Sequence, residues 1–168
     1  MKILAVSDNH GDRERIVELK ERYKDSVDVM LHCGDSELPF DSPEMEGFER
    51  VRGNCDMDSA YPDEKVVKVK GTTLFVTHGH LYGIKQSLDK IHYKASEEEA
   101  EIAFFGHSHS LGAEVIDQRL YINPGSILLP RDRKEASYAI VEKNEDEVSV
   151  HFYDELHNEL TSWSGQLT

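Results

Sequence analysis

Five short clusters of Asp, Asn, His and Cys lie along the first two thirds of the chain. In order they are Asp8-Asn9-His10, Gly34-Asp35, Gly53-Asn54-Cys55-Asp56, His78-Gly79-His80 and Gly106-His107-Ser108-His109. Imidazole nitrogens and carboxylate oxygens together suit Mn, Fe, Zn or Co, whereas Ca prefers oxygen alone. The same residue types also build ordinary turns, so no single cluster indicates a metal site. Their meaning depends on whether the fold brings them together.

The elements that precede the clusters predict that they meet. Four clusters directly follow short apolar runs of strand length, and the cluster at Gly53 follows a briefer run over 49–52. The four longer runs cover residues 2–7, 28–32, 73–77 and 101–105. Open α/β sheets bind ligands beyond the carboxyl ends of their strands, where residues far apart in sequence converge. We therefore expect one shared site.

The rest of the pattern predicts an α/β fold in which two sheets pack face to face with helices on the outside. A helix is expected after Asp12, which can cap it, and an irregular loop over 37–47. A β-hairpin is expected over 64–77, and a second helix over about 84–100. A closing meander of strands is predicted at 113–117, 120–123, 137–142 and 147–153.

The chain length of 168 residues predicts one domain over 1–156 and a C-terminal tail over 157–168. The tail lacks periodicity, so Trp163 could either dock on the domain or belong to a loose segment. This alternative stays open at the level of sequence.

Charge and composition limit the classes of partner. The formal net charge of −14 argues against a nucleic-acid groove, although a local cluster of cations could still bind a small anion. No stretch approaches the roughly 20 apolar residues that span a bilayer, and no signal-peptide pattern follows the N-terminus. The two cysteines, Cys33 and Cys55, fit a reducing compartment. We expect a cytoplasmic protein that does not bind membranes.

Spacing within the clusters indicates how two metal ions could be held. Asp8 and His10 lie two apart at a strand end, where an extended chain would point both side chains the same way. Asp35 could bridge two ions through its two carboxylate oxygens. The chain turns at His107 and His109, so these two histidines could face different ions.

Charge then indicates the reaction. Asn54 offers a neutral amide oxygen and His78 a further imidazole, so neither adds charge to the site. Two carboxylates, two divalent ions and a bridging hydroxide then give the site a net charge of about +1. Two ions roughly 3.5–4 Å apart lower the pKa of a bound water and clamp both oxygens of an in-line displacement, which matches hydrolysis at phosphorus. The residues expected to be structural or solvated instead are His32, His92, His151, His157 and Cys33.

With these motifs the chain resembles the calcineurin-like metallophosphoesterase superfamily, and more narrowly its small prokaryotic phosphodiesterase branch. The resemblance runs from Asp8 to Arg131 and includes the Asn-Pro-Gly-Ser sequence at 123–126. It implies a four-layer α/β/β/α sandwich of two mixed sheets flanked by helices, and a dimer or tetramer. It also implies that one metal is held by Asp8, His10, Asp35 and His109 and the other by Asp35, Asn54, His78 and His107. Manganese is the implied ion, with Ni, Zn, Fe, Co or Mg as alternatives.

The implied reaction is phosphodiester hydrolysis by metal-bound hydroxide, with His10, Asn54 and Cys55 as catalytic residues and Asn9 and His80 as substrate-binding residues. The chain departs from the superfamily at Cys55, where His usually stabilises the transition state and protonates the leaving alkoxide. A thiol of reference pKa about 8.5 is a weaker charge stabiliser than imidazolium. We therefore expect a preference for good leaving groups such as aryl alcohols.

A second hypothesis is a protein-interaction scaffold with little or no catalysis, because a retromer subunit uses the same fold mainly through its surface. The complete ligand set favours the enzyme, and Cys55 in place of His favours the scaffold. A zinc hydrolase of the metallo-β-lactamase type would need a His-x-His-x-Asp-His cluster, which the sequence lacks. Cyclic nucleotides, glycerophosphodiesters and nucleotide fragments stay open as substrates, as does monoesterase activity.

Overall fold

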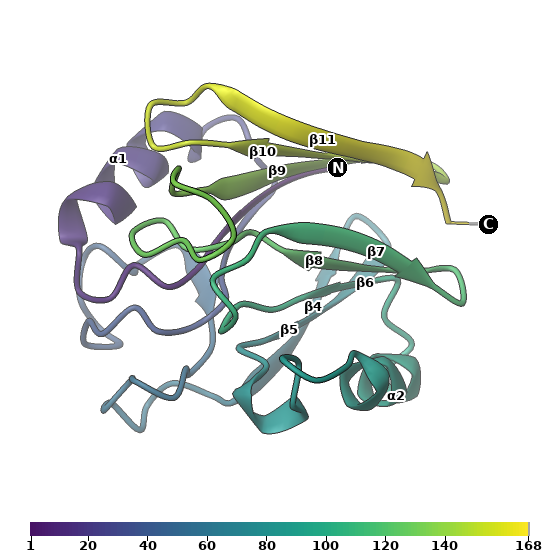
Figure 1. Cartoon of the computed structure of the whole chain (residues 1–168), viewed down its shortest axis with the longest axis horizontal. Helices are drawn as coiled ribbons and strands as arrows, with labels where there is room; N and C mark the ends of the chain where they lie inside the picture. Colours follow the sequence, from purple (N-terminus) through teal and green to yellow (C-terminus); the bar gives the residue numbers. More distant parts are fainter. Residues whose placement is uncertain (168) are drawn as a thin grey trace.

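Two β-sheets lie face to face in the computed structural model of the chain, which describes residues 1–167 (Figure 1). The first sheet contains β1 (Lys2–Val6), β2 (Val29–His32), β3 (Phe48–Arg50), β9 (Tyr138–Asn144), β10 (Glu147–Tyr153) and β11 (Glu159–Gln166), in the order β11-β10-β9-β1-β2-β3. The second contains β4 (Glu64–Val69), β5 (Thr72–Thr77), β6 (Ile102–Phe104), β7 (Gly112–Ile116) and β8 (Arg119–Asn123), in the order β4-β5-β6-β8-β7.

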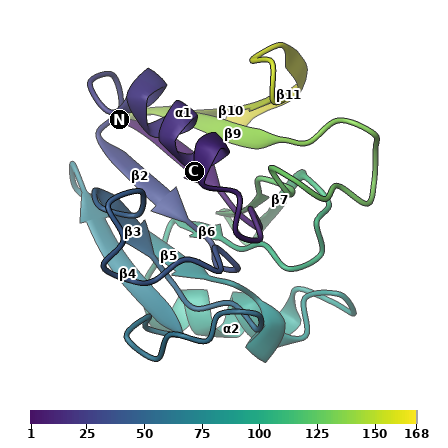
Figure 2. The ribbon, with the colours of Figure 1, turned by 90° about the vertical axis from the view of Figure 1, so that its left-hand side faces the viewer.

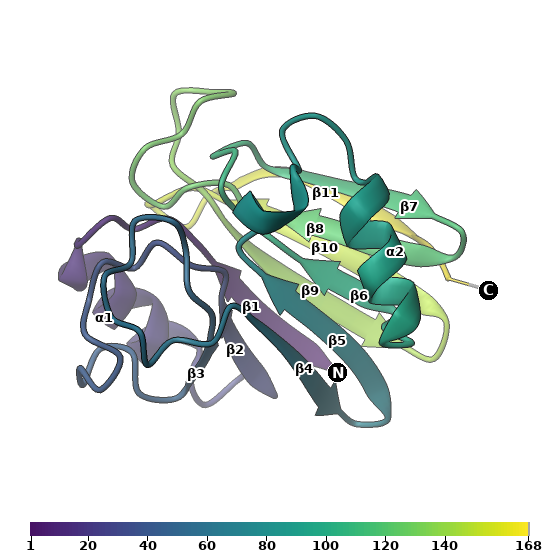
Figure 3. The same cartoon turned by 90° about the horizontal axis from the view of Figure 1, so that it is seen from below.

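Each outer face of this sandwich is covered by one α-helix. Helix α1 (Arg13–Tyr23) packs on the first sheet and α2 (Asp89–Glu97) on the second, as Figures 2 and 3 show. A fully buried apolar layer that includes Ile3, Leu31 and Val76 fills the space between the sheets. The predicted four-layer α/β/β/α sandwich is therefore confirmed.

Parallel pairing brings the metal-ligand clusters to one edge. In the first sheet β1, β2 and β3 are parallel neighbours, and in the second β5, β6 and β8 are parallel neighbours. The clusters follow the carboxyl ends of β1, β2, β5 and β6, and the cluster at Gly53 follows β3. The carboxyl ends of strands from both sheets thus bring the five clusters to one edge of the sandwich, as the sequence predicted.

Helix α1 begins where capping chemistry predicted. The Asp12 side chain accepts a hydrogen bond from the backbone N–H of Arg15 at 3.1 Å, which satisfies one of the unpaired donors of the first turn. Ile16 and Leu19 are buried against the first sheet. The capped end starts directly after the first ligand cluster, so the helix anchors that loop.

Helix α2 is shorter than predicted, because it begins at Asp89 and not near residue 84. Gly83 has a left-handed φ of 59°, and its carbonyl accepts from the backbone N–H groups of Gln86 and Ser87. Because these backbone groups are paired within the turn, the regular helix begins only after it. A short 3-10 helix, η1 (His80–Tyr82), precedes the turn.

The C-terminal boundary drawn at residue 157 needs correction. Residues 159–166 form β11, which pairs antiparallel with the whole of β10 and forms an edge of the first sheet. Trp163 lies opposite Val150 and packs against the apolar layer between the sheets, with Gly165 beneath its ring. The sequence pattern is irregular because the alternation of exposed and partly buried residues along this edge strand is interrupted at Thr161 and Ser162, which are both exposed. Thr168, also in the predicted tail, lies outside the described residues.

Within residues 1–167, no helix has the length and apolar character needed to cross a membrane.

Replacing Trp163 by Ala should lower the free energy of unfolding by about 2 kcal/mol, because a half-buried aromatic ring leaves the apolar layer. Urea unfolding followed by circular dichroism measures the change. Ser162 is exposed on the other side of β11, so Ser162→Ala should change stability by less than about 0.5 kcal/mol. Equal stability of the two variants would contradict the docked position of Trp163.

Candidate metal centre

The predicted ligands converge because the chain turns sharply after the strands. Five of them have left-handed backbone conformations, which non-glycine residues rarely adopt: Asp8 (φ 58°), His10 (41°), Asp35 (56°), His107 (68°) and His109 (59°). The expectation that Asp8 and His10 share a direction through an extended chain is therefore wrong. Asp8 and His10 instead converge because both have left-handed backbone conformations. Strained conformations of this kind are typical of functional sites.

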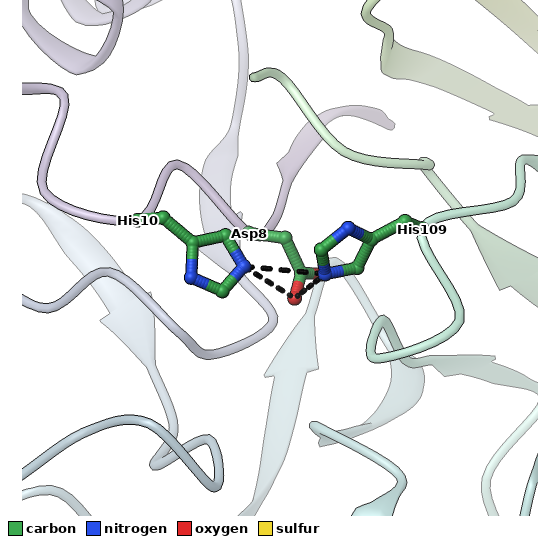
Figure 4. Close-up of side chains that lie close together, drawn as sticks. All are labelled: Asp8, His10 and His109. Atoms are coloured by element: carbon green, nitrogen blue, oxygen red, sulfur yellow. Dashed lines mark hydrogen bonds and ion pairs between the residues drawn. The ribbon is translucent and has the colours of Figure 1, made fainter. Parts of the chain in front are cut away.

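The Asp8 carboxylate lies at the centre of the first ligand group, between His10 and His109 (Figure 4). Its Oδ1 atom is buried without a hydrogen-bond donor among residues 1–167, and lies 3.2 Å from Nε2 of His109 and 3.7 Å from Nε2 of His10. Its Oδ2 atom accepts from the Ser7 hydroxyl at 2.5 Å and from the His107 N–H at 3.2 Å. One oxygen is thus held by the protein and the other faces the imidazoles.

The two imidazoles of this group present lone pairs to each other. Nδ1 of His109 donates to the Leu129 carbonyl at 2.8 Å, and Nδ1 of His10 donates to the Glu37 carboxylate at 3.1 Å. In the neutral rings these bonds leave both Nε2 atoms unprotonated, and the two Nε2 atoms lie 3.2 Å apart. Two acceptors at this distance repel each other unless a cation lies between them. The two Nε2 atoms and the Asp8 carboxylate therefore fit a divalent metal ion as ligands.

A second group forms around His78, on the other side of Asp35. Nδ1 of His78 donates to the Cys33 carbonyl at 2.6 Å, so its Nε2 faces Asn54 Oδ1 at 3.1 Å and Asp35 Oδ2 at 3.2 Å. Oδ1 of Asp8 lies 3.8 Å from the same nitrogen. Burial opposes a charge on His78, but the hydrogen bond to Asp35 and the charges of both carboxylates raise its pKa. A metal ion can supply the positive charge that a proton supplies here.

Asp35 lies between the two groups, as expected for a bridging ligand. Its Oδ2 is 3.2 Å from Nε2 of His78 and 3.9 Å from Nε2 of His10. Burial acts against the carboxylate, but the hydrogen bond with His78, the charges nearby and the backbone N–H of Cys55 keep the pKa of Asp35 well below its usual range. Asp35 is therefore ionised and can serve both sides.

His107 and His80 stand beside the second group. The His107 ring centre lies 5.2 Å from that of His78 and 6.1 Å from that of His80. Burial, the charge of His78 and that of Lys85 lower the pKa of His107 to about 4, so its ring is neutral and able to bind a metal. Nδ1 of His80 is buried without a partner among the described residues. His107 thus lies beside the second group, whereas His109 belongs to the first.

The Asn-Pro-Gly-Ser sequence supports both loops from behind. The Asn123 amide donates to the Gly106 carbonyl at 3.0 Å and to the Ser108 hydroxyl at 2.9 Å, which holds the His107 loop. The Ser126 hydroxyl donates to the Asp8 carbonyl at 2.8 Å and accepts from the Leu129 N–H at 2.7 Å. One turn therefore connects Asp8 to the carbonyl that orients His109.

Two residues that sequence reasoning did not assign also position ligands. The Asp56 carboxylate accepts from the N–H groups of Asp35 (2.9 Å), Gly53 (2.7 Å) and Glu37 (2.8 Å), and it joins two ligand loops. Glu37 in turn orients His10. The position of Asp56 at the end of the Gly-Asn-Cys-Asp motif is a sequence signal for its role in positioning the ligand loops, whereas no local pattern identifies Glu37. A Cβ on Gly53 would lie 2.0 Å from Asp35 Oδ1, so glycine is required there.

Asn9 is turned away from the ligands. Its amide donates to the Asp12 and Ser36 carbonyls at 3.1 Å and accepts from Nε2 of His32 at 2.7 Å. Nδ1 of His32 accepts from the Gly34 N–H at 3.1 Å, so the buried imidazole is neutral. The substrate-binding role predicted for Asn9 has no support in this placement, and the structural role expected for His32 is confirmed.

Cys55 lies at the margin of the centre. Ligand atoms of Cys55, His10 and Asp35 lie within 4.8 Å of one another, and its thiol is 3.6 Å from the Asn54 amide nitrogen. Burial, the charge of Asp35 and a hydrogen bond with it raise the pKa of Cys55 to about 11. The thiol therefore keeps its proton at neutral pH. Cys33, by contrast, is buried in the layer between the sheets.

Comparison with known proteins agrees with this geometry. Residues 1–146 match the family model described as the calcineurin-like phosphoesterase superfamily domain. The chain is 44% identical over 168 residues to the probable metallophosphoesterase YsnB of Bacillus subtilis, covering 100% of this chain and 99% of YsnB. It is 28% identical over 171 residues to the phosphodiesterase YfcE of Escherichia coli K12, covering 86% of this chain and 89% of YfcE.

Solved structures show the same fold. A predicted phosphoesterase from Streptococcus pneumoniae TIGR4 superposes with a TM-score of 0.96 at 39% identity, covering 98% of this chain and 97% of that one. Vps29 of Chaetomium thermophilum superposes with a TM-score of 0.78 at 15% identity, covering both chains completely. The second likeness concerns the fold alone.

Metal removal should destabilise the protein, because Asp8 and its imidazoles lose the cation that pairs them. We expect Mn²⁺ added to chelator-treated protein to raise Tm by several degrees, and His109→Ala to weaken Mn²⁺ binding at least tenfold. Thermal unfolding across a Mn²⁺ titration measures both effects. His151 lies on β10 and pairs with Glu159, so His151→Ala should bind Mn²⁺ like the wild type. Undiminished binding by His109→Ala would contradict the site.

His32 should make the metal-free protein sensitive to acid. Burial lowers its pKa to about 4 in the folded state, below the ordinary value of 6.5. As pH falls from 6.5 to 4 the unfolded chain therefore takes up the proton first, and about 3 kcal/mol of stability is lost. Urea unfolding in EDTA across this range should show a shallower pH dependence for His32→Gln than for the wild type. Identical pH dependences would disprove this role.

Proposed function

Because the chain belongs to the calcineurin-like phosphoesterase superfamily, we propose that this metallophosphoesterase is a phosphodiesterase that works with two divalent metal ions. The observation that carries the proposal is the pair of ligand groups that meet at Asp8, one of which also contains Asp35. On one side are His10 and His109, and on the other is His78. Every one of these imidazoles turns Nε2 toward the carboxylates, which is an arrangement for cations.

On this proposal, the ligands around Asp35 form two sets, one for each ion. Asp8, His10, Asp35 and His109 would hold one, and Asp35, Asn54, His78 and His107 the other. When bound, such a pair lowers the pKa of a water and neutralises charge on the phosphoryl oxygens. Mn²⁺ is our proposed ion, since mixed imidazole and carboxylate ligands suit it. The centre becomes locally cationic within a chain of net charge −14, which explains how an acidic protein can bind a phosphoester.

The surrounding side chains then bind the substrate and move its proton. The neutral His80 ring lies 5.4 Å from His78, and burial and the charge of His78 lower its pKa, so it can donate a hydrogen bond to a phosphoryl oxygen without adding charge. The amide of Asn54 lies on the same side. Cys55 carries its proton at neutral pH and is the proposed donor to the leaving oxygen.

A scaffold role on the same fold is the alternative, and the likeness to Vps29 concerns only the architecture. The ligand geometry argues for catalysis, since a surface-only role does not require buried imidazoles with lone pairs directed at a buried carboxylate. The two functions differ in one measurable property, which is metal-dependent turnover.

The test is reconstitution of chelator-treated protein with Mn²⁺, Ni²⁺, Zn²⁺ or Mg²⁺, assayed on an aryl phosphodiester and on the matching monoester. We expect diester hydrolysis, most strongly with Mn²⁺, and at least a hundredfold loss of kcat/KM in His109→Ala. His151→Ala should retain full activity. No turnover with any metal would favour the scaffold instead.

If the Cys55 thiol is a weak proton donor, the rate should depend strongly on the leaving group. In a series of aryl phosphodiesters, log kcat should fall steeply as the pKa of the leaving phenol rises, because the Cys55 thiol transfers its proton poorly. Cys55→His introduces an imidazole and should flatten the slope. A slope that is already flat in the wild type would show that proton donation is not limiting.

A further inference from the structure

A cavity of about 460 Å³ lies next to Cys55, and its lining includes none of the seven proposed metal ligands. Its lining is Glu37, Leu38, Pro39, Cys55, Met57 and Asp58. The wall combines three apolar side chains and a thiol with two carboxylates, and contains no Lys or Arg. Such a surface beside a cationic centre would bind the part of a substrate that is not the phosphate.

Two residues belong to both the cavity and the centre. The Cys55 thiol lies within 4.8 Å of ligand atoms of His10 and Asp35. The Glu37 carboxylate accepts from Nδ1 of His10 at 3.1 Å. A phosphoester held at the ligands would therefore have one substituent within reach of this cavity, on the side of the proposed proton donor.

The backbone on either side of Met57 is anchored, although the residue itself is 92% exposed. Asp56 accepts three backbone N–H groups, and Asp58 accepts those of Phe40 (2.8 Å) and Ala60 (2.9 Å). Met57 lines the cavity together with Leu38 and Pro39, so its exposed side chain is available to contact a group bound there. Methionine adapts its shape and contacts aromatic rings favourably.

The charges of the cavity restrict what it can accept. Glu37 and Asp58 line it, and Asp56 lies between Cys55 and Met57 in the same loop. An anionic substituent would meet like charge there, whereas a neutral ring would meet Leu38, Pro39 and Met57. The lining thus separates substrates by the charge and polarity of the group attached to phosphorus.

We propose that this cavity is the leaving-group subsite and takes a neutral aromatic substituent of the phosphodiester. The inference rests on the proposed function and specifies its substrate class: diesters with an uncharged ring on the leaving side, in preference to those with phosphorylated or carboxylated groups. Met57 is then a specificity-determining residue, and Cys55 joins the subsite to the reacting centre.

The kinetic test compares two aryl phosphodiesters whose phenols have equal pKa, one neutral and one carrying a carboxylate. Equal phenol pKa removes chemical reactivity from the comparison. Wild type should prefer the neutral diester at least tenfold in kcat/KM, and Met57→Lys should reduce this preference about fivefold by offsetting the local carboxylates. Tyr93 is 70% exposed on α2 and lines neither the cavity nor the centre, so Tyr93→Lys controls for net charge.

A binding measurement that needs no turnover keeps the two proposals separate. Phenylphosphonate should bind the Mn²⁺-loaded protein about tenfold more tightly than methylphosphonate, and Met57→Ala should remove most of that difference. Wild type that hydrolyses no diester but shows this Met57-dependent difference overturns the proposed function and leaves the subsite standing. Hydrolysis with preferences unchanged in both Met57 variants overturns the subsite alone. If Met57→Lys only dissociates an oligomer, the surface is a contact between copies.

Discussion

The site depends on a buried carboxylate of one sheet meeting imidazoles of the other. Asp8 follows β1 in the first sheet, whereas His78 and His109 follow β5 and β6 in the second. A buried carboxylate oxygen such as Oδ1 of Asp8, which has no donor in the described part of the chain, is costly, since charge removed from water needs a partner. A bound divalent cation would supply that partner for the carboxylate and for the imidazole lone pairs together. The apolar layer between the sheets must therefore hold both halves of the ligand set at fixed distance.

The backbone carries strain to make this meeting possible. Left-handed conformations at Asp8, His10 and Asp35 are stable only where the surroundings determine them. Asp56 provides such support by accepting three backbone N–H groups, and Ser126 does so by donating to the Asp8 carbonyl. A rigid second layer of hydrogen bonds of this kind also fixes the tautomers of the ligand histidines.

The loop that follows β3 combines two properties that act in the same direction. Cys55 is a weak acid, which on our proposal restricts catalysis to leaving groups that depart easily. Met57 and Leu38 form an apolar wall beside it, which on our proposal selects neutral rings. Aromatic alcohols are both better leaving groups than alkyl alcohols and better partners for such a wall. Chemistry and recognition thus favour the same kind of diester.

The sequence alone determined the layers, the order of the strands along the chain and most of the residues that meet in the candidate metal centre, because strand periodicity and metal-ligand chemistry are local properties. It did not determine the start of α2 or the docking of β11, since both depend on a turn at Gly83 and on contacts made by Trp163. Only the tertiary structure decided that Asn9 is structural, that Glu37 orients His10, and that a cavity adjoins Cys55. These features arise between residues far apart in the chain, where spacing carries no information about distance.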